Sequence, residues 1–263
     1  MDKLPVALTI AGFDPSAGAG VLADVRTFAA FGVSAVAAVT SLTFQNDREF
    51  FGAVHQSGAT VRSQVESLTE RYSIVCAKTG MLPTVEVVRE VALLFRDENL
   101  PAPVVDPVLM SSSGKQLMED AAVSVLTNEL FPICRVVTPN IPEAEKLTEM
   151  QITSEAQMRA AAAQIRKSGA RAVLIKGGHL SGDLSIDVLD DGGEISVFRG
   201  ERIPGAELHG SGCVLSAAIA AGLCKGMTLK NAVADAKSFV LEKLRKVVGG
   251  QLSVTSRKRP ENQ

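Results

Sequence analysis

Two glycines flank a serine at the start of the run LHGSGCVLSAAIAAGL (208–223), which continues with small and apolar residues and contains no proline. This pattern predicts a loop that turns into a helix. The first backbone N–H groups of a helix are unpaired and carry partial positive charge, which suits phosphate oxygens. Gly210 and Gly212 lack a Cβ and let backbone amides approach a ligand closely. The segment is therefore a candidate anion hole.

Cys213 falls in the first turn of this predicted helix, where a thiolate would be stabilised and could act as a base at the rim of the anion hole. The competing interpretation is an ordinary Gly-Ser-Gly loop followed by a small buried cysteine beside Val214 and Leu215. Taken alone, the segment favours this second interpretation, because glycine-rich turns before helices are common. Other parts of the chain must decide between the two.

Asn140 and Glu143 lie three residues apart at the start of another predicted helix, so both can face one site. Oxygen ligands of this kind suit Mg²⁺ together with its waters. The alternative is a helix N-cap with a capping-box glutamate, which requires the same spacing.

Gln45 follows a predicted strand, and its amide could offer both a donor and an acceptor to a planar heterocycle. A solvated loop glutamine is the simpler interpretation.

Asp24 is expected in the first turn of the helix after the glycine-rich loop at 11–20, either as a residue that stabilises the helix dipole or as a carboxylate that faces the ligand. That loop is neither a Walker motif nor a dinucleotide fingerprint, because the required Lys and third Gly are missing.

Short apolar runs alternate with helical patterns along the chain. Such alternation indicates βαβ units, and thus an α/β fold with a mostly parallel central sheet and helices on both faces. Asp191-Gly192-Gly193 lies between two strand-like runs and predicts a hairpin. The other strands are expected at 5–10, 35–40, 74–77, up to 106, 136–137 and 172–176, and the other helices at 21–32, 58–71, 84–96, 154–168 and 231–247.

Ligands of such sheets bind beyond the carboxyl ends of the strands. Several polar residues lie at the ends of predicted strands or in the loops that follow them, so they should collect at one edge of the sheet and favour a binding site there. These residues are Asp14, Gln45, Lys78, Asp106, Asn140 and Lys176.

The composition predicts a single domain over 1–263, because 263 residues with 46% hydrophobic content can fill one sizeable core. A formal net charge of −2 gives no basic field for nucleic acid, and the basic cluster at 257–259 lies in a polar tail, about 249–263, that we expect to be mobile. The absence of a signal peptide or an apolar span predicts a cytoplasmic protein. Four cysteines without C-x-x-C spacing predict neither a disulfide nor a zinc site.

A series of motifs now resembles one known family, the hydroxymethylpyrimidine/phosphomethylpyrimidine kinases. The resemblance covers residues 8 to about 243 and implies a three-layer ribokinase-like fold, ATP and Mg²⁺ as cofactors, a role in thiamine biosynthesis and a homodimer. Pyridoxal kinases form a close branch, so the motifs define phosphotransfer better than they define the substrate. The matching segments are ALTIAGFDPSAGAG, ADVRTFAAFGV, KTGML, VVDPVLMSSSG, VTPNIPEAE, VLIKGGHL and HGSGCVLSAAIAA.

The resemblance also implies roles for individual residues. Gln45 would contact the polar edge of the pyrimidine ring, and Cys213 takes the position where most ribokinase-like sugar kinases have an aspartate. The other residues implied around the pyrimidine are Gly12, Asp24, Met81 and Val108. Those implied near Mg²⁺ are Asp106, Asn140 and Glu143. Those implied at the ATP phosphates and the anion hole are Lys176, Asn140, His209, Gly210, Ser211 and Gly212.

Three features depart from the family pattern. Phe13 stands where serine or threonine is usual, Glu207-Leu208 replaces Asn-Thr before His209, and the final glycine- and histidine-rich segment is missing. A pyridoxal kinase is the alternative if Phe13 reshapes the pocket. A catalytically silent pyrimidine-binding sensor is a second alternative, and the retention of catalytic residue types argues against it.

Overall fold

The computed structural model of the chain describes residues 4–98, 100–111, 113–178, 180, 182, 184–205 and 209–248. The expected tail at 249–263, with its basic cluster, and the Glu207-Leu208 pair lie outside these residues. Within the described ranges, no helix is long and apolar enough to cross a membrane.

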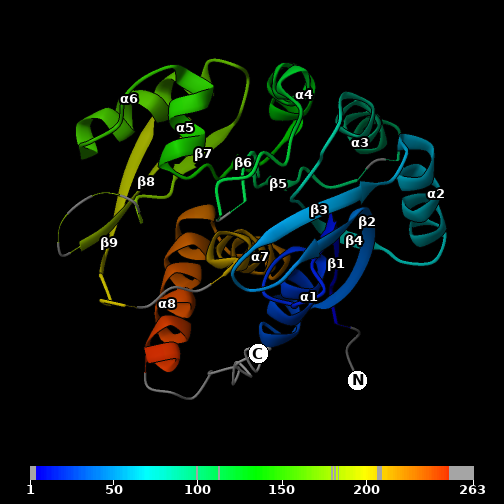
Figure 1. Cartoon of the computed structure of the whole chain (residues 1–263), viewed down its shortest axis with the longest axis horizontal. Helices are drawn as coiled ribbons and strands as arrows, with labels where there is room; N and C mark the ends of the chain where they lie inside the picture. Colours follow the sequence, from blue (N-terminus) through cyan, green and yellow to red (C-terminus); the bar gives the residue numbers. More distant parts are fainter. Residues whose placement is uncertain are drawn as a thin grey trace, which may run out of the picture.

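A nine-stranded sheet forms the central layer (Figure 1), in the order β3-β2-β1-β4-β5-β6-β7-β8-β9. The six strands from β2 to β7 in this order are parallel, whereas β3 pairs antiparallel with β2, and β8 pairs antiparallel with both β7 and β9. The predicted mostly parallel sheet is confirmed. The strands are β1 Val6–Phe13, β2 Ser34–Gln45, β3 Phe50–His55, β4 Ile74–Thr79, β5 Val104–Val105, β6 Val136–Val137, β7 Ala172–Ile175, β8 Leu184–Asp191 and β9 Glu194–Glu201.

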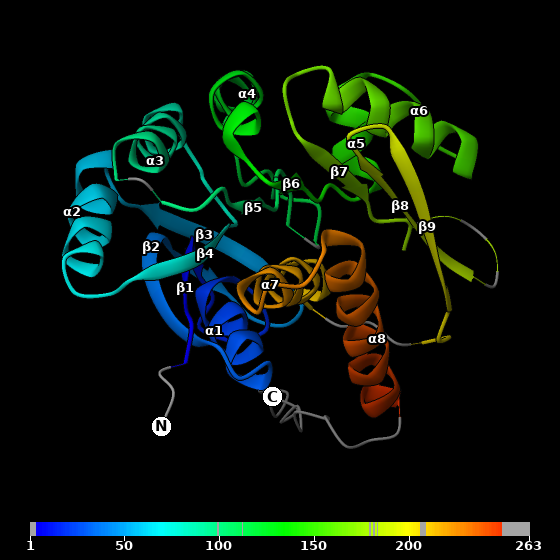
Figure 2. The ribbon, with the colours of Figure 1, turned by 180° about the vertical axis from the view of Figure 1, so that it is seen from behind.

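Helices cover both faces of the sheet (Figures 1 and 2): α1, α7 and α8 share one apolar cluster, and α2 to α6 share another. Successive strand residues point to opposite faces, so Ala7 packs with the first cluster, whereas Leu8 and Ile10 pack with the second. The helices are α1 Gly20–Ala30, α2 Gly58–Thr69, α3 Val85–Asp97, α4 Asp120–Val125, α5 Ile141–Thr148, α6 Glu155–Arg166, α7 Ser211–Cys224 and α8 Leu229–Val248.

The largest difference from the sequence-based assignment lies at residues 41–55. The strand expected at 35–40 continues to Gln45, and β3 returns beside it, so the expected loop is a hairpin. The turn is closed by the Asn46 side chain, which accepts hydrogen bonds from two following backbone N–H groups. Periodicity does not reveal this hairpin, because Leu42 and Phe44 are exposed instead of facing a core.

In two further regions the structure can be compared with the sequence-based assignment, which misses a helix in one and is confirmed in the other. The sequence-based assignment has no helix between 97 and 140, but α4 occupies part of that segment and is followed by a π turn and a 3-10 turn. The predicted hairpin between β8 and β9 is confirmed, and Gly192 and Gly193 adopt positive φ values of 67° and 103° in its turn.

Candidate active site

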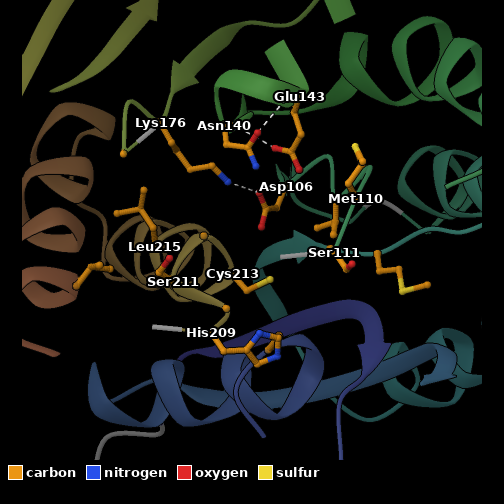
Figure 3. Close-up of a pocket in the computed structure, with 18 of the residues that line it drawn as sticks. Asp106, Met110, Ser111, Asn140, Glu143, Lys176, His209, Ser211, Cys213 and Leu215 are labelled. Carbon is orange, nitrogen blue, oxygen red and sulfur yellow. Dashed lines mark hydrogen bonds and ion pairs between the residues drawn. The ribbon is translucent and has the colours of Figure 1, made fainter. Parts of the chain in front are cut away.

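A cavity of about 570 Å³ opens at the carboxyl ends of the parallel strands (Figure 3), which is a usual size for a small-molecule site. The glycine-rich segment 209–213 forms part of its wall. The predicted convergence at this sheet edge is confirmed, since all six polar residues line the same cavity: Asp14, Gln45, Lys78, Asp106, Asn140 and Lys176.

The start of α7 has the geometry expected of an anion hole. The helix begins at Ser211, after Gly210 with a positive φ of 74°. A Cβ on Gly210 would lie 2.1 Å from the carbonyl oxygen of Gly18, so only glycine fits there. A Cβ on Gly212 would lie 3.1 Å from Lys176 Nζ. The N–H end of α7 therefore faces a lysine ammonium, and both favour an anion.

Lys176 forms a buried ion pair with Asp106, in which Nζ lies 2.7 Å from Oδ1. The position of Lys176 is fixed by its backbone N–H, which donates to the carbonyl of Pro139. Burial would raise the pKa of Asp106, but Lys176 and Lys78 together hold that pKa below its usual value. Asp106 in turn raises the pKa of Lys176 despite burial. Both members of the pair are therefore ionised at neutral pH.

Asn140 and Glu143 form a complete capping box at the start of α5. The Asn140 side chain accepts a hydrogen bond of 2.9 Å from the Glu143 N–H, and the Glu143 carboxylate accepts one of 2.8 Å from the Asn140 N–H. The capping interpretation of their spacing is confirmed. Both residues also line the cavity, and burial raises the pKa of Glu143 to about 7. A contact with a metal ion stays a prediction.

Cys213 lies in the first turn of α7 and lines the cavity, as expected. The Gly20 N–H at the start of α1 acts to lower the pKa of the Cys213 thiol. Burial nevertheless raises the pKa of the Cys213 thiol to about 12, although Lys78 opposes the rise. The prediction of a stabilised thiolate is therefore wrong for the chain without ligands, because two helix starts do not outweigh burial near two carboxylates. Its action as a base stays a prediction.

Asp24 requires a correction. Because α1 begins at Gly20, Asp24 lies in the second helical turn and not in the first. Its carboxylate is completely buried, accepts a hydrogen bond from Thr9 and lies 2.9 Å from Lys78 Nζ. Asp24 thus lies outside the cavity wall, and the prediction that it bounds the substrate pocket is wrong. It compensates the charge of Lys78, which does line the cavity.

The wall of the predicted substrate end contains the remaining residues that the resemblance assigns there: Gly12, Gln45, Met81 and Val108. A Cβ on Gly12 would lie 3.1 Å from Met81 Sδ, so these two residues pack closely. Phe13 lies outside the cavity wall, and its carbonyl accepts a hydrogen bond from Thr43. Phe13 therefore has no direct contact with the cavity, although its neighbours Gly12 and Asp14 and its hydrogen-bond partner Thr43 line it.

Sequence reasoning misses the opposite end of the cavity, which β8, β9 and α8 enclose. Lys237 Nζ lies 2.6 Å from Asp187 Oδ2, and the other oxygen of Asp187 accepts a hydrogen bond from the Gly177 N–H. No spacing indicates this wall, because lysines and leucines on an amphipathic helix look like ordinary surface and core residues. The other cavity-lining residues of β8, β9 and α8 are Ser185, Gly200, Glu201, Val240, Leu241 and Leu244.

The oxygen ligands at the cavity fit a magnesium ion that is carried by a nucleotide. No group of three or more His, Cys, Asp or Glu side chains in the described ranges could hold a metal ion by itself. Mg²⁺ usually keeps several waters and takes only one or two carboxylates besides the phosphates of the substrate. Asp106 and Glu143 supply that number, and Asp106 Oδ2 is engaged by a long hydrogen bond of 3.3 Å from Ser216.

Sheet order and helix layers give the chain a ribokinase-like fold. Solved structures with this fold include the pyridoxal kinase of Bacillus subtilis, which has a TM-score of 0.82, 35% identity and 90% of each chain covered. The phosphomethylpyrimidine kinase of Clostridium difficile 630 has a TM-score of 0.80 and 33% identity, with 91% of this chain and 99% of that chain covered.

The profile of the phosphomethylpyrimidine kinase family matches residues 14–258. The hydroxymethylpyrimidine/phosphomethylpyrimidine kinase of Streptomyces coelicolor is 40% identical over 236 residues, 90% of this chain and 87% of that protein. The thiamine biosynthesis bifunctional protein of Geobacter sulfurreducens is also 40% identical, and the match covers 90% of this chain and 49% of that protein. The chain belongs to the hydroxymethylpyrimidine/phosphomethylpyrimidine kinase family.

Proposed function

We propose that the protein transfers the γ-phosphoryl group of ATP to the hydroxymethyl oxygen of 4-amino-5-hydroxymethyl-2-methylpyrimidine, and then phosphorylates the monophosphate to the diphosphate. One observation carries this proposal: a single cavity holds an ionised lysine and the amide end of α7 together with a glutamine among apolar residues. The lysine and the α7 amides suit phosphates, whereas the glutamine and its apolar neighbours suit a small heterocycle. Relatives named hydroxymethylpyrimidine/phosphomethylpyrimidine kinase, and bifunctional thiamine biosynthesis proteins, support the same assignment. The reaction would take place in the cytoplasm, where ATP is available.

Catalysis would consist mostly of positioning and electrostatics. Negative charge spreads over the moving phosphoryl oxygens, and Lys176 with the N–H groups of 210–213 would stabilise it without rearranging. The ion pair with Asp106 fixes Lys176 for this purpose. Only the first transfer needs a base, because a primary alcohol must lose its proton, whereas the attacking phosphate oxygen of the second transfer is already anionic.

Magnesium belongs to the same proposal. When bound with ATP, Mg²⁺ neutralises charge on the β- and γ-phosphates. Asp106, Asn140 and Glu143 border the cavity and would hold the ion, in part through water.

A panel of acceptors with ATP tests the proposed substrate. Product masses should show the pyrimidine monophosphate and diphosphate, and pyridoxal should be phosphorylated far more slowly. Pyridoxal is the matched comparison because a pyridoxal kinase has a TM-score of 0.82 to this chain. If pyridoxal alone were phosphorylated, the protein would be a pyridoxal kinase and the proposed pyrimidine substrate would be wrong. If no acceptor caused release of ADP, the result would support a catalytically silent sensor.

Replacing Gln45 by alanine is expected to weaken pyrimidine binding by about 1–3 kcal/mol, the usual cost of leaving a buried polar group unpaired. The affinity can be measured by calorimetry without ATP. Gln56→Ala serves as the control, because Gln56 lies outside the cavity wall. If Gln45→Ala bound the pyrimidine with unchanged affinity, the Gln45 side chain would not contact the pyrimidine.

We also propose that the protein forms a homodimer through the β2–β3 hairpin. Leu42 is 46% exposed, Phe44 53% and Val54 52%. Leu42 pairs with Val54 and Phe44 with Gly52, so these side chains share one face of the hairpin. A contiguous apolar face of this kind typically marks a protein interface. A second copy can cover it symmetrically.

A charge on this face should separate the two copies. Phe44→Glu is expected to convert a dimer into a monomer, because burying an unpaired carboxylate is costly. Light scattering after gel filtration gives the mass. Tyr72→Glu is the matched control, since Tyr72 is 43% exposed but lies in the turn between α2 and β4, away from the hairpin. A wild-type monomer, or a dimer that survives in Phe44→Glu, would contradict the proposal.

A further inference from the structure

The loop between β1 and α1, residues 14–19, is organised around the carboxylate of Asp14, which is only 1% exposed. Asp14 Oδ1 accepts hydrogen bonds from the N–H and the hydroxyl of Ser16, at 2.8 and 2.7 Å. Asp14 Oδ2 accepts one of 2.8 Å from the Ala19 N–H. Burial opposes ionisation, but these donors and His209 together lower the pKa of Asp14. The loop therefore encloses a fixed negative charge.

One partner of this carboxylate comes from a distant part of the chain. His209 Nε2 lies 3.0 Å from Asp14 Oδ2, although the two residues are 195 positions apart. His209 directly precedes Gly210, the N-cap of α7 (Figure 3). The imidazole thus connects the loop after β1 to the entrance of the anion hole.

The backbones of the two segments also touch. A Cβ on Gly18 would lie 2.4 Å from His209 Cδ2, and a Cβ on Gly210 would lie 2.1 Å from the Gly18 carbonyl oxygen. The same hypothetical Cβ on Gly210 would lie 2.9 Å from the Cα of Ala19. The Asp14–His209 hydrogen bond and the close approach of Gly18 to His209 and Gly210 therefore hold the loop at residues 14–19 against residues 209–210.

The two joined segments serve different ends of the cavity. Gly12, Asp14 and Gly20 line it from the β1 side, near the residues assigned to the pyrimidine, whereas 209–213 form the anion hole. An in-line transfer requires the acceptor oxygen and the phosphoryl group to be aligned, and a displacement of about 1 Å can lower the rate by about 10²-fold. A shift of one segment against the other would change this alignment.

We propose that Asp14 and His209 are positioning residues for phosphoryl transfer, whose pair holds the acceptor side of the cavity against the anion hole. The inference rests on the proposed function. It predicts that breaking the pair lowers kcat and leaves ground-state binding nearly unchanged, because each half of the cavity keeps its own contacts.

The test is a double-mutant cycle with Asp14→Asn and His209→Ala, assayed with ATP and the pyrimidine. Each single variant should lose about 10–100-fold in kcat, with KM for ATP and for the pyrimidine changed by less than about threefold. The double variant should lose little more than either single variant, because the two residues act as one unit. His209→Gln, whose amide nitrogen can replace Nε2 as a donor, should recover part of kcat.

Ser16→Ala is the matched control, because it removes a donor from the same carboxylate without touching the 209–213 segment. It should keep kcat near that of the wild type, and thermal unfolding should show that every assayed variant is folded. Additive losses in the cycle, normal kcat in both single variants, or an equal loss in Ser16→Ala would each overturn the positioning role while the wild type stays active. A wild type inactive towards every acceptor would instead overturn the proposed function and this inference with it.

Discussion

Cys213→Ala is expected to lower the rate of phosphoryl transfer to the hydroxymethyl oxygen by about 10²–10⁴-fold, the typical contribution of a positioned base. The second transfer should suffer much less, because its nucleophile carries no proton that must leave. Each acceptor is given separately, and both rates are measured with saturating ATP. Cys224→Ala is the control, since Cys224 lies at the other end of α7. Equal losses in both transfers would mean that Cys213 shapes the anion hole, and no loss in either would make it a simple packing residue.

The pKa of Cys213 sharpens this expectation. Since burial raises it to about 12, only about 10⁻⁵ of the thiol is ionised at pH 7, and this fraction grows about tenfold with each pH unit. If the thiolate is the base, kcat/KM of the first transfer should rise about tenfold per unit between pH 7 and 9. The second transfer should lack this slope. A first transfer that is flat over this range would contradict the thiolate as the base in the free enzyme.

Much of the site could be predicted because its polar residues follow the strands in the sequence. Asp106 and Lys176 come directly after short buried strands and Asn140 follows β6 by three residues, and parallel strands bring their carboxyl ends to one edge. The glycines at 210 and 212 could be recognised for the same reason, since a loop that must approach a ligand and start a helix has few alternatives. For these residues, position along the chain and residue type were sufficient to predict a place in the site.

The failures have a common physical cause, which is that burial is a tertiary property. The type of Asp24 suggests a solvent-facing or ligand-facing carboxylate, but the strand that carries Lys78 places a cation against it in the interior. The helix start alone predicts a low pKa for Cys213, whereas the surrounding packing and carboxylates raise it. Likewise the Lys237–Asp187 pair joins a helix and a hairpin that no local pattern connects.

Lys176→Ala is expected to lower both transfers by a similar factor of about 10²–10³, comparable to the loss of one oxyanion-hole donor. The ammonium lies beside the start of α7 and would meet the same phosphoryl oxygens whichever acceptor is bound. Breaking the buried pair also leaves Asp106 without its cation, so the free energy of unfolding should fall by about 3–5 kcal/mol. Rates are therefore measured well below the melting temperature of the variant.

Lys237→Ala provides the contrast, because Lys237 is partly buried, forms an ion pair with the buried Asp187, and lies in the cavity wall that β8, β9 and α8 enclose. Loss of that lysine should mainly raise KM for ATP, whereas loss of Lys176 should mainly lower kcat, since only Lys176 faces the α7 amides where transition-state charge develops. If Lys176→Ala impaired one transfer and spared the other, or if it raised KM alone, the lysine would serve to bind one ligand and would not stabilise the moving phosphoryl group.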